Sequence, residues 1–180
     1  MRLRIEPLSD EHNRAAFSCG HDLVDGFLHR YARQRRERNI GTTLVAVDAD
    51  NGSSRIVGFH TLLPHEFRGA ELPDSQRRAT RVGQLSAIPG ALLAQLGVDV
   101  SVQGQGIGVV LVRHALARAL YLAEEFGCVA VVTDPIDDRA RRLYTGFGFT
   151  PLVGNPSRLI LSVKAIAEAT RLSLEREAGG

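Results

Sequence analysis

The chain contains few of the residues and patterns that mark whole classes of protein. Its two cysteines, Cys19 and Cys128, are too few and too far apart to predict a disulfide framework. The N-terminal residues lack a basic segment followed by an apolar run, so we expect no signal peptide. No apolar stretch reaches the length of a membrane-spanning helix. These absences predict a soluble cytoplasmic protein that makes no contact with a membrane.

Lysine is almost absent, although positive charge is not. Lys164 is the only lysine among 22 lysine and arginine residues, and the formal net charge is +2. A skewed genome composition explains such a bias, but arginine also binds phosphate well because its planar guanidinium offers a fork of donors. The length of 180 residues predicts that residues 1–180 form a single domain with a substantial core.

Hydrophobic periodicity predicts an α/β fold. We expect strands over residues 3–8, 42–47, 56–63, 91–100, 128–133 and 159–163. We expect helices over residues 10–16, 23–38, 109–126, 139–145 and 165–175, and a loop or a marginal helix over residues 64–80. The strands on either side of the helix 109–126 should be parallel, because a crossover helix joins them. A mixed sheet with helices on both faces follows.

The stretch after the strand that ends near Val100 has the composition of an anion-binding loop. It reads Gln103-Gly104-Gln105-Gly106-Ile107-Gly108, and the expected helix follows it from Val109. Glycine lets the backbone approach a ligand closely, and the first N–H groups of a helix lack partners within that helix. These N–H groups and the helix dipole favour an anion, so we expect a diphosphate at this loop.

Two common diphosphate motifs do not fit the loop. No Gly-Lys-Ser/Thr follows the glycines, as a nucleoside-triphosphate loop requires. A dinucleotide fingerprint would need a glycine or an alanine at Val109. What remains is Gln103-x-x-Gly106-x-Gly108 between a strand and a helix, which resembles the acetyl-CoA loop of the GCN5-related N-acetyltransferases, the GNAT family. The alternative is a glycine-rich surface turn that binds nothing.

A second segment carries the same resemblance. Residues 140–149, Ala-Arg-Arg-Leu-Tyr-Thr-Gly-Phe-Gly-Phe, are similar to the A-x-x-x-Y-x-x-x-G-F ending of the family. The resemblance implies the GNAT fold, which has a mixed, mostly antiparallel central sheet, helices on both faces, and a parallel pair of strands splayed at the cofactor loop. It implies no metal, and acetyl-CoA as a cofactor bound by Val98, Val100, Gln103, Gly104, Gln105, Gly106, Ile107, Gly108, Asp137 and Tyr144. Asp137 departs from the pattern, because many members have asparagine there.

The first half of the chain resembles one branch of this family. The motifs Phe17-Ser18-Cys19-Gly20, Leu23-x-x-Phe27-Leu28 and Thr42-Thr43-Leu44-Val45 are similar to those of the acetyltransferase toxins of bacterial toxin–antitoxin pairs. The likeness covers about residues 17–163. It implies that the chain acetylates the free α-amine of an aminoacyl-tRNA and so blocks translation. It also implies an antitoxin partner of the ribbon-helix-helix class and a homodimer.

Acetyl transfer to such an amine needs few side chains. An α-amine has a pKa of about 7.7–8.0, well below that of lysine, so a strong general base is not required. Asp99 or a water is a candidate to assist, although a charged strand end is more often merely solvated. The resemblance implies that backbone N–H groups near Val100 polarise the thioester carbonyl and that Tyr144 protonates the leaving thiolate. The alternative role of Tyr144 is to pack its short helix onto the sheet.

A tRNA substrate would bring many phosphates to the protein, and its affinity should come from arginine and fall with salt. Three groups are candidates for this contact: Arg33, Arg35, Arg36 and Arg38; Arg77, Arg78 and Arg81; and Arg139, Arg141 and Arg142. Taken alone, the first group is more typical of a solvated helix end whose charge complements the dipole.

Two other functions stay open at this point. An acetyltransferase for a small amine, a peptide or a protein N-terminus needs no broad cationic surface, so its turnover would be insensitive to salt. A catalytically silent acyl-CoA-binding module would bind the cofactor without turnover and would tolerate Tyr144→Phe.

Overall fold

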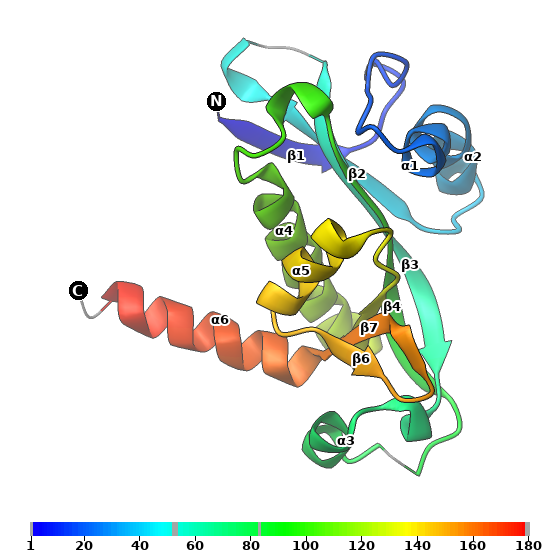
Figure 1. The fold of residues 1–180 in the computed structure, drawn as a ribbon, viewed down its shortest axis with the longest axis vertical. Coiled ribbons are helices and arrows are strands. Elements are labelled where there is room, and N and C mark those ends of the chain that lie inside the picture. Colours follow the sequence, from blue (N-terminus) through cyan, green and yellow to red (C-terminus); the bar gives the residue numbers. More distant parts are fainter. Residues whose placement is uncertain (1, 52–53, 83, 179–180) are drawn as a thin grey trace. The chain divides into compact units, whose positions relative to one another are not determined.

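A single sheet contains the strands of the computed structural model, which describes residues 2–51, 54–82 and 84–178 (Figure 1). Within these residues the strands are β1 (Leu3–Pro7), β2 (Thr42–Asp48), β3 (Ile56–Phe67), β4 (Ile88–Val98), β5 (Ala130–Thr133), β6 (Thr150–Leu152) and β7 (Asn155–Ser162). Their order in the sheet is β1-β2-β3-β4-β5-β7-β6. The pairs β1–β2, β2–β3, β5–β7 and β6–β7 are antiparallel. β4 and β5 run parallel, so the predicted mixed sheet is confirmed.

The helices follow the predicted order with one exception. They are α1 (Asp22–Gly26), α2 (Ala32–Glu37), α3 (Asp74–Thr80), α4 (Ile107–Phe126), α5 (Asp138–Gly146) and α6 (Val163–Ala178). A π-helical turn, η1 (Phe27–Tyr31), joins α1 to α2, so the predicted helix 23–38 is nearly continuous. Short 3-10 turns lie at η2 (Ala49–Asn51), η3 (Gly69–Glu71) and η4 (Val100–Val102). No helix among the described residues is long and apolar enough to cross a membrane.

The predicted helix over residues 10–16 is wrong. The chain there makes short turns, in which the N–H of Arg14 donates to the carbonyl of His12 and that of Phe17 to Arg14. The backbone N–H of Ser9 donates to the His12 ring instead of starting a helical ladder. Polar side chains that hydrogen-bond nearby backbone compete with helix formation, and this segment has few apolar residues to oppose them. The marginal segment 64–80 divides between the end of β3 and α3.

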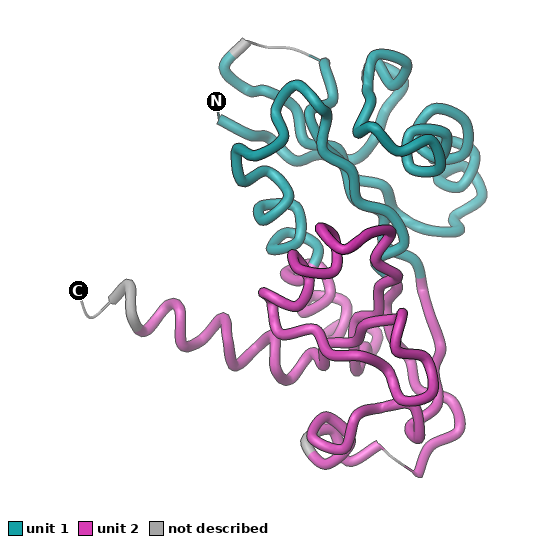
Figure 2. The backbone as a smooth tube through the Cα atoms, viewed as in Figure 1, with its two compact units in different colours: residues 1–63, 93–115 teal, residues 64–92, 116–180 magenta. Residues whose placement is uncertain are grey.

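The chain divides into two compact units, residues Met1–Leu63 with Leu93–Ala115 and residues Pro64–Leu92 with Leu116–Gly180 (Figure 2). In the first unit, alternate residues of β2 point to opposite faces of the sheet. One face packs against the α1–α2 segment through Val24, Phe27, Leu28, Val45, Val47 and Phe59. The other face packs against α4 through Ala46, Val57, Ile107 and Leu111. Helices therefore cover both faces of this part of the sheet.

The second unit has a core of its own, formed by Phe67, Leu72, Ile88, Ala130, Val132, Leu152 and Ile160. Gln76 attaches α3 to this core, since its Nε2 donates to Thr150 Oγ1 at 2.8 Å and to the Ile160 carbonyl at 3.2 Å. The expectation of a single domain stays a prediction, because each unit is described here by itself.

Gly97 is a test of packing in the first unit. A Cβ at this position would lie 2.9 Å from the Phe59 ring and 3.1 Å from both Phe17 and Val24. Overpacking of this kind costs about 1–3 kcal/mol, so Gly97→Ala should lower the free energy of unfolding by that amount in urea denaturation. The control is Gly146→Ala, since a Cβ there meets nothing within 4 Å and α5 should gain about 0.5–1 kcal/mol. Equal stability of the two variants would contradict the packing described.

Candidate active site

The turn from β4 into α4 leaves backbone N–H groups open to a ligand. Gly104 and Gly106 have φ angles of +82° and +80°, a region that favours glycine. A Cβ at either position would meet nothing within 4 Å, so both glycines border open space. The N–H groups of Val109 and Val110 bond to the Gly106 carbonyl, at 3.0 Å and 3.2 Å. The N–H groups that precede them in α4, those of Ile107 and Gly108, are at the end of the helix where partners within the helix are lacking and where the dipole favours an anion. This backbone fits the diphosphate of coenzyme A.

The side chain of Gln103 braces the base of this loop. Its Nε2 donates to the Cys19 carbonyl at 2.9 Å and to the Val98 carbonyl at 3.0 Å. The amide is therefore directed at the protein, and any contact of Gln103 with a cofactor is left to its backbone. Gln105 lies in the loop before α4, whereas Ile107 and Gly108 are the first residues of α4, which begins two residues earlier than the sequence predicted.

Asp99 is buried, which corrects the expectation of a solvated strand end. Only 3% of the residue is exposed. Its carboxylate accepts from the Ser18 N–H at 3.2 Å, the Ser101 N–H at 3.1 Å, the Ser101 hydroxyl and the Arg55 guanidinium. Burial alone would raise the pKa of Asp99, but the hydrogen bonds from Ser101 and Ser18 and the charge of Arg55 together lower it. A carboxylate held in this way is a poor proton acceptor, so Asp99 is not a general base.

The N–H groups around Val100 are also taken, which corrects a second expectation. Those of Asp99 and Val100 donate to the carbonyls of Val57 and Ser18, at 3.0 Å and 2.8 Å. Those of Ser101 and Val102 bond to the side chain and the carbonyl of Asp99. A donor to a thioester carbonyl must therefore come from outside residues 99–102.

Tyr144 lies in the second unit, on α5. Asp137 caps this helix, because its Oδ1 accepts from the Ala140 N–H at 2.6 Å, so aspartate does the capping that asparagine would do. Tyr144 is 5% exposed, and its ring lies 5.6 Å from that of Phe149. Burial raises the pKa of Tyr144 to about 12, although a hydrogen bond with Thr133 opposes the rise. The phenol therefore keeps its proton at neutral pH.

A polar cluster next to Thr133 was missed by the sequence analysis. Arg158 donates to both oxygens of Asp134, at 2.8 Å and 2.6 Å, and its Nη1 lies 3.3 Å from His65 Nε2. Burial and the charge of Arg158 lower the pKa of His65, so the imidazole is held neutral. These residues come from β7, the end of β5 and β3, and only the pairing of the strands brings them together. No local motif signals such a cluster.

The four arginines of the first group differ in the contacts that their side chains already make within the protein. Arg33 forms ion pairs with Asp10 and Glu37, at 3.7 Å and 3.3 Å. Arg35 lies over the Phe27 ring at 5.6 Å, and Arg36 donates to the Leu8 carbonyl. Among these four arginines, Arg38 is exposed at the end of α2, and its guanidinium makes no ion pair, hydrogen bond or ring contact with the part of the chain that the structure describes.

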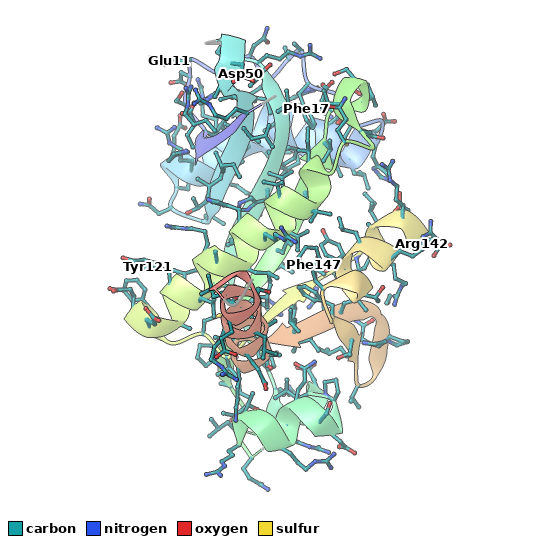
Figure 3. All side chains as sticks on the ribbon, turned by 90° about the vertical axis from the view of Figure 1, so that its left-hand side faces the viewer. Glu11, Phe17, Asp50, Tyr121, Arg142 and Phe147 are labelled. Carbon is teal, nitrogen blue, oxygen red and sulfur yellow. The ribbon has the colours of Figure 1, made fainter. Side chains whose placement is uncertain are left out.

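The arginines of the second and third groups also differ in the contacts that they make. Arg77 pairs with Asp74, and Arg141 donates to the carbonyls of Pro156 and Ser157. Arg142 is exposed on α5, where its side chain points outward (Figure 3). The other exposed members of the two groups are Arg78, Arg81 and Arg139. Among the described residues, no group of three or more histidine, cysteine, aspartate or glutamate side chains could hold a metal ion.

A family model described as "Acetyltransferase (GNAT) family" matches residues 6–149. The chain belongs to the GNAT family. Two curated relatives are similar over almost their whole lengths. A "Probable toxin TacT" of Sinorhizobium fredii is 32% identical, over 90% of this chain and 92% of its own. A "tRNA-acetylating toxin" of Mycobacterium tuberculosis is 30% identical, over 87% of this chain and 90% of its own.

Solved structures extend the comparison. AtaT complexed with acetyl-methionyl-tRNAfMet is 26% identical and matches 94% of this chain and 99% of its own, with a TM-score of 0.84. AtaTR bound with acetyl-CoA is 26% identical and matches 93% of this chain and 98% of the other, with a TM-score of 0.79. A tyrosine-to-phenylalanine variant of AtaT, bound to the C-terminus of the antitoxin AtaR, is 25% identical over 93% of this chain and 96% of its own, with a TM-score of 0.76.

Gly106→Ala should weaken cofactor binding by more than it weakens the fold. A non-glycine residue at positive φ costs about 1–2 kcal/mol of stability, and the new methyl group takes up the open side of the loop. We expect the Kd for acetyl-CoA, measured by calorimetry, to rise at least tenfold, or about 1.4 kcal/mol. The control is Gly154→Ala, since Gly154 has a φ of +78° and a Cβ there also meets nothing within 4 Å. It should cost the same stability and leave the Kd unchanged, and an equal loss of affinity would argue against this loop as the cofactor site.

Proposed function

We propose that this chain transfers the acetyl group of acetyl-CoA to the α-amine of an aminoacyl-tRNA and so blocks translation, as the toxin of a toxin–antitoxin pair. The observation that carries the proposal is its similarity, along nearly the whole chain, to a tRNA-acetylating toxin. The structure of a relative with acetyl-methionyl-tRNA supports the same acceptor. The open glycine backbone and the protonated Tyr144 supply what such a reaction needs from the protein.

The mechanism assigns few tasks to side chains. Bound acetyl-CoA supplies the thioester that the amine attacks. The backbone of residues 103–108 would hold its diphosphate, and the Tyr144 hydroxyl would give its proton to the leaving thiolate while the amine loses a proton to water. An α-amine with a pKa of about 7.7–8.0 is partly neutral at physiological pH, and esterification of the adjacent carboxyl lowers this pKa further. The buried, fully bonded Asp99 fits a reaction without a protein base.

Tyr144→Phe tests the proposal together with its acceptor. We expect the wild type to transfer label from radiolabelled acetyl-CoA to one or more members of a pool of charged tRNAs. The variant keeps the ring that packs on Phe149 but has no proton to donate, so kcat should fall by about 10²–10⁴-fold with little change in the far-UV spectrum.

The control for this experiment is Tyr121→Phe. Tyr121 is exposed on α4, where Arg118 lies 5.6 Å from its ring, so removing its hydroxyl should leave kcat unchanged. A wild type that labels no aminoacyl-tRNA would contradict the proposed function. Full activity of Tyr144→Phe would remove Tyr144 as the general acid.

The proposal includes partners and domain organisation. An antitoxin is supported by the relative that was solved with the C-terminus of its own antitoxin. We further propose that this antitoxin belongs to the ribbon-helix-helix class and that the toxin is a homodimer, both from the resemblance to the toxin branch. The family match runs through both compact units, which supports their action as one acetyltransferase domain.

Arg142 and Arg77 make a matched pair for testing contact with tRNA. Arg142 is exposed and has no ion-pair partner in the described ranges, whereas Asp74 already neutralises Arg77. If Arg142 contacts a phosphate, Arg142→Glu should weaken tRNA binding and reduce the slope of log K against log salt by about one. Arg77→Glu should change the slope less. Turnover that does not respond to salt in the wild type would instead favour a small-amine acceptor.

A further inference from the structure

Two segments far apart in the sequence are joined at the base of the cofactor loop. The Val100 N–H donates to the Ser18 carbonyl at 2.8 Å, and the Ser18 N–H donates back to Asp99 Oδ2 at 3.2 Å. Gln103 Nε2 adds a third link, to the Cys19 carbonyl at 2.9 Å. The turn formed by residues 18–20, here called the S18 turn, is thus fixed to both ends of the segment 99–103.

The Asp99 carboxylate lies at the centre of this junction. Each of its bonding partners described above is a donor: two backbone N–H groups, the Ser101 hydroxyl and the Arg55 guanidinium. Arg55 also donates to the Ser101 hydroxyl at 2.7 Å, which closes the cluster from the solvent side. A buried carboxylate is costly unless such partners satisfy it, so these donors together allow Asp99 to remain charged in the protein interior.

The S18 turn and the cofactor loop lie on different faces at the carboxyl end of β4. Phe17, which precedes the turn, packs with the α1–α2 segment on one face, whereas the loop leads into α4, which packs on the other. A cofactor held by the loop would lie beside the N-terminus of α4. An acceptor that must reach the same thioester then has the face of the S18 turn available to it.

We propose that Asp99 is a positioning residue that couples the cofactor loop to the S18 turn, so that bound acetyl-CoA orders the surface that orients the acceptor amine. The inference rests on the proposed acetyl transfer. The coupling itself is a property of the first compact unit and is measurable without an acceptor, because an ordered loop transmits its order only through the links described.

Asp99→Asn changes the hydrogen bonding of residue 99 without changing the size of its side chain. Three donors, the Ser101 N–H, the Ser101 hydroxyl and the Arg55 guanidinium, share Oδ1 of Asp99, whereas the Ser18 N–H bonds to Oδ2. The oxygen of the amide satisfies most donors at the Oδ1 position, so its NH2 group then faces the Ser18 N–H and that link is lost. We expect CoA to slow hydrogen exchange of both the loop (residues 103–108) and the S18 turn in the wild type, but only of the loop in the variant. With kcat expressed per CoA-binding site, we expect a fall of about 10–100-fold while the KM for acetyl-CoA changes by less than about threefold, because misorientation affects the transition state more than binding.

Ser101→Ala is the matched control. It removes one donor from the same carboxylate but leaves the bond between Asp99 and the Ser18 N–H, so the response of the S18 turn to CoA and kcat should both be retained. If Asp99→Asn does not fold, Gln103→Ala removes the separate link to the Cys19 carbonyl, and it should weaken the response of the turn to CoA.

The outcomes separate this proposal from the proposed function. The coupling would be overturned if CoA does not change the hydrogen-exchange rate of the S18 turn in the wild type. It would also be overturned if Asp99→Asn leaves kcat unchanged. A wild type that protects both segments on binding CoA, but acetylates no charged tRNA, would support the coupling and overturn the acceptor.

Discussion

The division of backbone N–H groups between β4 and the start of α4 is the constraint on which the rest of the structure depends. A polar backbone group inside a fold must be bonded, and a cofactor can use only those that the protein leaves unbonded. Residues 99–102 bond their N–H groups internally, and the side chains of Asp99 and Gln103 tie the same segment to the turn at Ser18. The positive φ angles of Gly104 and Gly106 then turn the chain into α4, where the Gly106 carbonyl accepts from the N–H groups of Val109 and Val110 and the preceding N–H groups lie at the N-terminus of the helix. Side chains hold the protein to itself here, and the backbone is left for the ligand.

The elements that sequence reasoning located correctly are those with local causes. The glycine turn and α4 follow from glycine spacing and a long apolar period, and the cap at Asp137 follows from a carboxylate placed before the helix. The buried strand β5 reads as a short apolar run for the same reason. Tyr144 was located by a motif, and its burial explains both alternatives considered for it, since one ring packs on Phe149 and also carries a proton with a raised pKa.

What the sequence left undetermined has distant causes. From its neighbours in the sequence, Asp99 is predicted to be a charged residue at the end of a strand. Its partners Ser18 and Arg55 are 81 and 44 positions away in the sequence, so no local pattern indicates that they bond to it. The cluster of His65, Asp134 and Arg158 depends on the pairing of strands in the sheet. The helix expected after Ser9 failed because a side-chain contact with His12 competed with backbone bonding, an outcome that propensity alone does not weigh.

Contacts within the protein limit which arginines are available to bind the phosphates of tRNA. The chain has 22 cationic and 20 anionic side chains, and clusters of arginine in the sequence suggest three phosphate-binding surfaces. In each cluster, one arginine already binds another part of the protein. Arg33 pairs with Asp10 and Glu37, and Arg77 pairs with Asp74. Arg141 donates to the carbonyls of Pro156 and Ser157. A guanidinium already paired with a carboxylate must give up that partner to bind a phosphate, which cancels much of the gain. Affinity for a nucleic acid therefore has to come from the exposed remainder, of which Arg38, Arg78, Arg81 and Arg142 are members. A small number of such contacts gives a shallow dependence on salt, and this suits an enzyme that must release its acetylated product and turn over.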